Sequence, residues 1–228
     1  MAKKQTVKKT AAPRRSPLPF IIIGVVLLAA VGAGAWYLSR SRQPGALAAG
    51  LPGAQPAHAE GGDERAPVVL EEFGDYQCPP CGQMFPEVER IRQDYGDRVR
   101  FVFRQYPLVN VHPHALRAAH AAEAAGLQGK FWEMHREMFT DQQTWSRSQD
   151  PAPLFENYAR RAGVDVERFR RDLGSPQTDA RVVADRERAK SVGVESTPTF
   201  YVNGRKLSTA QTSGKGLREE IDRVLGGG

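Results

Sequence analysis

A chain of 228 residues with only two cysteines can hold one sizeable domain and its appendages, but it cannot be a small fold stapled by several disulfides. Its formal charge of +6 is concentrated at one end, because six of the 32 basic residues lie within the first fifteen positions and the other 26 match the 26 acidic residues in number. The body of the protein therefore carries no net charge. This argues against nucleic-acid binding, which needs basic residues clustered on a folded face.

A long uncharged segment follows the basic N-terminus. Residues 16–39 contain no charged side chain, and residues 20–38 are almost all apolar. About 20 such residues in a helix cross a bilayer core of about 30 Å. Positive charge marks the cytoplasmic side, so we predict a cytoplasmic tail (1–17), a transmembrane signal-anchor helix (18–38) and an extracytoplasmic remainder. A cleaved signal peptide is the alternative, although its apolar core usually spans only about 7–15 residues.

Residues 39–66 are rich in small residues and proline, with seven Ala, five Gly and three Pro among 28. Such a composition buries little apolar surface. We expect a flexible linker, which as a random coil would reach roughly 30 Å.

The folded domain is expected to begin at residue 67 and to continue to residue 228. Residues 68–73 form an apolar run typical of a buried strand, and a helix with apolar residues at helical spacing follows the cysteine pair. Residues 98–103 alternate polar and apolar side chains, which indicates a second strand. A strand–helix–strand unit implies that the two strands pair in parallel.

A helical block is predicted over residues 114–192, and a strand–turn–strand and a last helix follow it. Residues 199–202 read as a strand, Asn203-Gly204 as a hairpin turn and residues 217–225 as an amphipathic helix. Glycine and proline clusters predict breaks in the block at residues 126–129, 149–153, 163–165 and 174–176.

The only cysteines, Cys78 and Cys81, lie directly after the first strand and at the start of the helix. A thiolate there meets the positive end of the helix dipole, so its pKa falls and it becomes a good nucleophile and leaving group. We expect an exposed Cys78 to exchange with substrate and a buried Cys81 to resolve. Two alternatives are half of a zinc site, which needs four ligands, and an inert disulfide, which would close too short a loop to stabilise much.

A second motif, Ser196-Thr197-Pro198-Thr199-Phe200-Tyr201-Val202-Asn203-Gly204, follows the helical block. A strand, a Cys-Pro-Pro-Cys helix start and this late Thr-Pro resemble the thioredoxin superfamily over about residues 66–225. The helical insertion narrows the resemblance to its DsbA-like branch. It implies an α/β thioredoxin-like fold with an inserted helical subdomain and a cis Thr197–Pro198 bond facing the cysteines. Glu72 matches an acidic residue of the first strand in that branch and, if buried near Cys81, could relay protons. Glu71 should point to the other face.

The resemblance implies a monomeric protein-disulfide oxidoreductase that needs no cofactor or metal beyond its redox-active disulfide. Its substrates would be reduced or unfolded secreted proteins, and a quinone-linked membrane protein would be its redox partner. Dithiol oxidation is the expected direction. Extracytoplasmic disulfide reduction and a redox-silent, membrane-anchored peptide-binding module are the alternatives. Pro79 and Pro80 bring no backbone N–H to the first helical turn, so the Cys78 thiolate should be less stabilised, and the potential less oxidising, than the extreme of about −120 mV.

Overall fold

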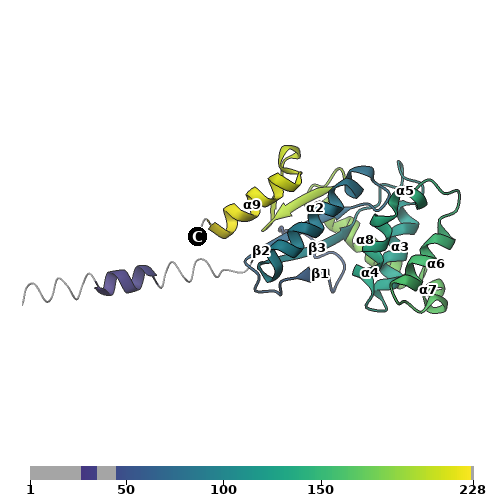
Figure 1. The fold of residues 1–228 in the computed structure, drawn as a ribbon, viewed down its shortest axis with the longest axis horizontal. Coiled ribbons are helices and arrows are strands. Elements are labelled where there is room, and N and C mark those ends of the chain that lie inside the picture. Colours follow the sequence, from purple (N-terminus) through teal and green to yellow (C-terminus); the bar gives the residue numbers. More distant parts are fainter. Residues whose placement is uncertain (1–26, 35–44, 227–228) are drawn as a thin grey trace, which may run out of the picture. The chain divides into compact units, whose positions relative to one another are not determined.

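The computed structural model describes residues 27–34 and 45–226 (Figure 1). Residues 27–34 are helical. Within the described residues, no helix combines the length and the apolar character needed to cross a membrane. The predicted tail (1–17) lies outside the described residues, as does most of the predicted anchor (18–38), so both remain predictions.

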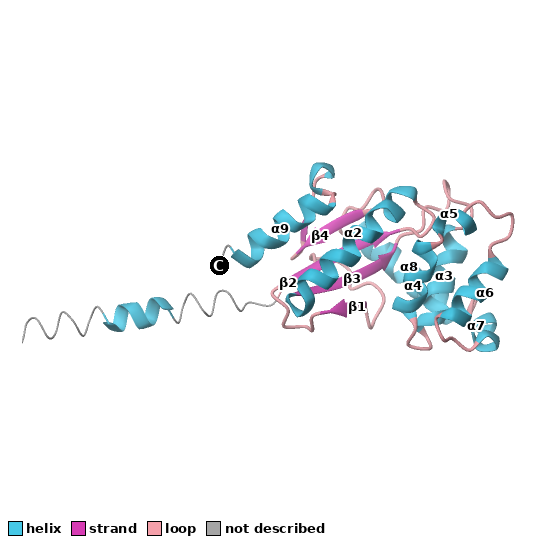
Figure 2. Cartoon of the chain, in the orientation of Figure 1, coloured by secondary structure: helices cyan, strands magenta, loops and turns pink. Residues whose placement is uncertain are grey.

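A five-stranded sheet in the order β1-β3-β2-β4-β5 forms the centre of the domain (Figure 2). The central strands β2 and β3 pair in parallel and are joined through α2, as the strand–helix–strand pattern predicts. The other three pairings are antiparallel. The bounds are β1 His58–Gly61, β2 Val68–Gly74, α2 Pro79–Tyr95, β3 Val99–Gln105, β4 Thr199–Val202, β5 Arg205–Lys206 and α9 Gly214–Gly226.

Side chains of β2 alternate between two faces, because successive residues of a strand point to opposite sides. Val68 and Leu70 pack in the main core with residues of α2 and α9, whereas Phe73 packs in a smaller cluster with Ala189 of α8. The strand is buried throughout. This explains why its sequence reads as an apolar run interrupted only by the two glutamates.

Six helices between β3 and β4 form the helical insertion and gather at one side of the sheet in Figure 1. They begin and end close to the predicted breaks, and one further break separates α4 from α5 at Asp141. The bounds are α3 Ala115–Gly126, α4 Phe131–Thr140, α5 Gln142–Trp145, α6 Ala152–Arg161, α7 Val166–Asp172 and α8 Pro176–Ser191.

The predicted linker (39–66) is wrong over its described part, because residues 45–66 belong to the folded domain. Strand β1 lies within this segment and pairs with β3, and residues 45–57, here called the strap, are bound by side chains of the domain. Arg188 donates to the carbonyl oxygens of Ala48 and Leu51, and Arg104 donates to that of Ala54. Hydrogen bonds from buried arginines to backbone order this segment, so its low apolar content did not decide its structure.

Candidate active site

Cys78 and Cys81 lie at the start of α2, as the sequence predicts. Cys78 is the N-cap residue, and Pro79 and Pro80 occupy the first two helical positions. Both cysteines are free. The expectation that Cys78 is exposed is wrong, since 4% of its surface is accessible while Cys81 is fully buried. Pro79 and Pro80, which follow Cys78, are exposed.

The two thiols differ strongly in acidity. A hydrogen bond from the Cys81 side chain lowers the pKa of Cys78 to about 6 against the opposing effect of burial, and a hydrogen bond from the Cys81 backbone adds to this. Burial raises the pKa of Cys81 well above its ordinary value. At neutral pH, therefore, Cys78 is the thiolate and Cys81 keeps its proton.

Thr197 and Pro198 lie opposite the cysteine pair, at the start of β4. Their peptide bond is cis. In its protonated form the Cys78 thiol donates to the carbonyl oxygen of Thr197 over 3.4 Å, while the buried hydroxyl of Thr197 has no hydrogen-bond partner among the described residues. The structure thus brings the two sequence motifs together, although 119 positions separate them.

Glu72 lies on the α2 side of the sheet and is 4% exposed. Burial, aided by the negative charge of Cys78, raises the pKa of Glu72 to about 8. Its charge in turn contributes to the raised pKa of Cys81. A carboxyl that exchanges a proton near neutral pH beside a thiol of high pKa can supply and accept the proton of that thiol.

Glu71 points to the opposite face, as strand alternation requires. There the Arg104 side chain donates one hydrogen bond to the Glu71 carboxylate. Arg188 donates two, one to each carboxylate oxygen. The two adjacent glutamates thus lie on opposite faces of the sheet. Glu71 is paired with arginines, and Glu72 has a raised pKa.

His112 and His135 form contacts within the domain. His112 contacts the carboxylate of Asp75 at 2.7 Å, and Asp75 in turn accepts from the backbone N–H groups of Gln77 and Leu108. His135 is buried against Tyr76 and has a lowered pKa because of that burial. Among the described residues, no group of three or more His, Cys, Asp or Glu side chains could hold a metal ion.

Gln142 is a positioning residue that sequence reasoning missed. Its side-chain amide donates to the carbonyl oxygens of Tyr76 and Cys78, both over 2.8 Å, and so fastens α5 to the turn that carries Cys78. Gly82 makes room for it, because a Cβ at that position would lie 2.1 Å from the Gln142 side-chain oxygen. A glutamine in a polar segment gives no sequence signal for this contact.

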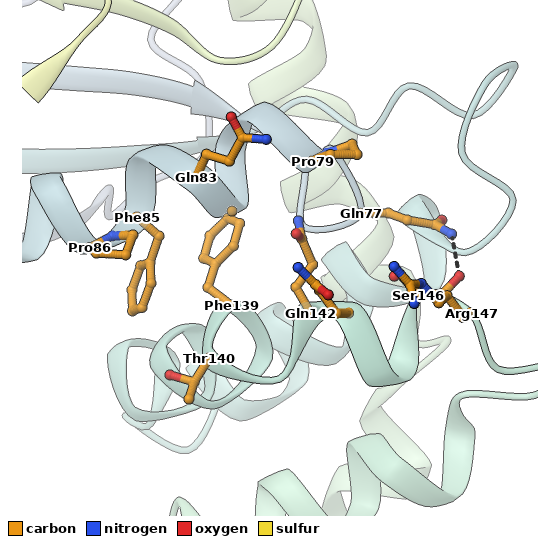
Figure 3. A pocket seen from close by; sticks show the side chains of 12 residues that line it. Gln77, Pro79, Gln83, Phe85, Pro86, Phe139, Thr140, Gln142, Ser146 and Arg147 are labelled. Atoms are coloured by element: carbon orange, nitrogen blue, oxygen red, sulfur yellow. Dashed lines mark hydrogen bonds between the residues drawn. The ribbon is translucent and has the colours of Figure 1, made fainter.

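Two grooves flank the first turn of α2 and share Gln83. The first, of about 520 Å³, runs beside the cis-proline and is lined by Pro80, Met84, Thr197, Pro198 and Leu207. The second, of about 720 Å³ and here called the helical groove, lies between α2 and the helical insertion (Figure 3). Its lining includes Pro79, Gln83, Phe85, Phe139, Gln142 and Arg147.

Residues 55–223 match the family model described as Thioredoxin. The chain belongs to the thioredoxin family. Its fold matches BdbD from Bacillus subtilis in the oxidised form, with a TM-score of 0.67 and 23% identity over 79% of this chain and 99% of that one. It also matches the thiol-disulfide exchange protein alpha-DsbA2 from Wolbachia pipientis, with a TM-score of 0.63 and 18% identity over 75% and 88% of the two chains.

A thioredoxin-like oxidoreductase from Silicibacter pomeroyi is 28% identical, with a TM-score of 0.58 over 73% of this chain and 91% of that one. Together with the family match, these likenesses show a thioredoxin fold with a helical insertion, in which the cysteine pair is placed as described. The thioredoxin family and the fold that the two motifs predicted are thereby confirmed.

Two curated relatives that match this chain are named as antiporters and not as oxidoreductases. Na(+)/H(+) antiporter NhaA 1 of Salinispora arenicola is 42% identical over 174 residues, which are 71% of this chain and 26% of that protein. NhaA 1 of Mycolicibacterium gilvum is 40% identical over 143 residues, which are 62% and 22%. The chain thus spans about a quarter of the length of the curated relatives it matches, and the similarity covers its thioredoxin part.

Proposed function

We propose that this protein is a dithiol oxidase that introduces disulfides into extracytoplasmic proteins through Cys78 and Cys81. The observation that carries the proposal is the contrast between the two thiols. A pKa of about 6 stabilises the reduced, thiolate form of Cys78 relative to the disulfide, and a dithiol enzyme whose reduced form is stabilised is an oxidant.

In the proposed reaction, a substrate thiolate attacks Sγ of Cys78 in the disulfide form, and the Cys78–Cys81 bond breaks. Cys81 leaves with the electron pair and takes the proton that Glu72 holds. A second substrate thiolate then attacks the substrate sulfur of the mixed disulfide and releases Cys78 as a thiolate. The substrate has lost two electrons and the enzyme has gained them, so a quinone-linked membrane partner is proposed to take them up.

The proposed location rests on the basic N-terminus, the apolar run over residues 18–38 and the outward orientation that these predict. A periplasmic thioredoxin-like protein from Salmonella enterica serovar Typhimurium shares the fold, with a TM-score of 0.59. The site described above supports thiol chemistry, so the antiport in the names of the curated relatives is not carried over to this chain.

Turnover of a reduced, unfolded test protein by the full chain in detergent, with glutathione disulfide as oxidant, tests the proposal. We expect catalysed disulfide formation that Cys78→Ser abolishes, and a potential between about −120 and −230 mV. A potential below about −270 mV would instead indicate a reductase. Substrate binding with no dependence on Cys78 would indicate a peptide-binding module.

A further inference from the structure

The helical groove borders the reacting cysteine, yet the reaction described above does not use it. Gln77 and Pro79, the neighbours of Cys78, lie at one end of its lining. Phe85 reaches into it from α2 and Phe139 from α4, and together they form an apolar wall (Figure 3). A chain whose cysteine is joined to Cys78 would extend along such a surface.

Polar groups of the groove are uncharged apart from one residue. Gln77, Gln83, Gln142 and Gln143 line it, and its lining includes no aspartate or glutamate. Arg147 is the single charged residue in that lining. The groove therefore presents an apolar wall, neutral hydrogen-bonding groups and one positive charge.

Arg147 is not neutralised by the domain. It is exposed, and no acidic side chain within the described residues forms an ion pair with it. Arg161 and Arg170 of the same helical insertion, by contrast, are each paired with a glutamate. An unpaired cation at the edge of a groove attracts an anion and repels a cation.

We propose that the helical groove binds the substrate chain next to its reacting cysteine and that Arg147 selects acidic side chains there. This inference rests on the proposed function and adds a substrate preference to it. The substrate backbone forms hydrogen bonds with the glutamines, and an apolar side chain packs against Phe85 and Phe139. An aspartate or glutamate near the substrate cysteine forms an ion pair with Arg147. Each dithiol that is oxidised transfers two electrons to the Cys78–Cys81 disulfide, which glutathione disulfide restores.

Three synthetic dithiol peptides of one sequence test this, with Glu, Gln or Lys placed two and three residues to either side of the first cysteine. Oxidation rates are measured with the full chain at low ionic strength. We expect the Glu peptide to react roughly three- to fivefold faster than the Lys peptide, as suits one solvent-exposed charge pair, with the Gln peptide between them. Added salt should reduce the difference.

Arg147→Glu should reverse this order. Arg171→Glu is the matched control, because Arg171 is an exposed arginine on α7 outside the groove and the net charge changes equally. Equal rates for the three peptides, or the same order in Arg147→Glu, would overturn the inference while leaving the oxidase intact. If none of the peptides were oxidised, the proposed function would fall and this inference with it.

Discussion

Glu71 and Glu72 are neighbours in one strand, but they face different surroundings. Glu71 is paired with two arginines, whereas Glu72 has no arginine beside it and its pKa is raised to about 8 by burial and by the charge of Cys78. An unpaired buried carboxyl is costly when ionised, and such residues are concentrated at functional sites. Ionisation of Glu72 therefore carries the cost of a buried, unpaired charge, whereas Glu71 is paired.

Glu72→Gln should stabilise the reduced protein at neutral and alkaline pH. A carboxyl whose pKa rises on folding destabilises the fold once the pH exceeds its unfolded value of about 4.5, and this cost grows until the pH passes the folded value of about 8. The variant lacks this titration. Its gain in the free energy of unfolding should therefore increase between those two pH values, reach on the order of 5 kcal/mol and then level off.

Urea denaturation of the full chain at a series of pH values measures this gain. In the disulfide form Cys78 carries no charge, so the gain should be smaller there. A gain independent of pH would show that Glu72 does not titrate as described. Oxidase turnover should fall in the same variant, because a glutamine amide cannot pass a proton to Cys81.

At the scale of elements, Gln142 joins the helical insertion to the thioredoxin part at the reacting turn. Its two hydrogen bonds go to the backbone on either side of Gln77, and one of them shares the Cys78 carbonyl with the N–H of Gly82. Gln142 of α5 is thus in direct contact with the residue that carries the reactive thiol.

Gly82→Ala should be harmful only while Gln142 is present. The added Cβ would displace the Gln142 side chain, so we expect a loss of about 1–3 kcal/mol of stability and a shift in the pKa of Cys78. In the Gln142→Ala background the same change should cost much less, since the space is then free. The two single variants and the double variant form a double-mutant cycle. Urea denaturation measures their stability, and the pH dependence of Cys78 alkylation measures the pKa of Cys78. Additive costs would contradict the contact.

Arg188 connects the strap to the sheet through Glu71. Arg188→Met would leave Glu71 with Arg104 alone and would free the carbonyls of the strap, so we expect a loss of about 3–5 kcal/mol in the free energy of unfolding. The double variant Glu71→Gln/Arg188→Met should recover part of that loss. Arg186→Met, at an arginine of α8 with no ion pair among the described residues, is the control and should change stability by less than about 0.5 kcal/mol. Equal losses in the control and in Arg188→Met would contradict the role of the buried pair.

Periodicity and turn chemistry predicted the elements that bury an apolar face. The strands β2, β3 and β4, the helix after the cysteines and the hairpin at Asn203-Gly204 were all predicted from local sequence. β1 and the strap were not, because β1 is held by backbone pairing with β3 and the strap by hydrogen bonds from distant arginines, and neither set of partners can be found without the fold. The same limit applies to the site. The motifs located the cysteines and the cis-proline, whereas Gln142 became visible only through its contacts.

At the scale of the whole molecule, the correction at the strap changes the proposed tether. Residues 45–66 of the predicted 28-residue linker belong to the folded domain, and the other six, 39–44, lie outside the described residues. Six residues span at most about 20 Å. If residues 18–38 cross the membrane as proposed, these six residues limit how far the folded domain can lie from the membrane in which the proposed redox partner lies.

The proposed topology places the folded domain on the outer side of the membrane, and labelling of the chain's own cysteine can test it. In the Cys81→Ala variant, Cys78 is the only thiol, and a membrane-impermeant maleimide should label it in intact bacterial cells. Labelling that appears only after lysis would place the domain in the cytoplasm and would contradict the proposed orientation. A carbonate wash of the membranes separates an uncleaved anchor, which stays with the membrane, from a cleaved signal peptide, whose product is released. Replacing the six basic residues of the first fifteen with glutamine should reduce outward labelling, because those charges set the orientation of the anchor.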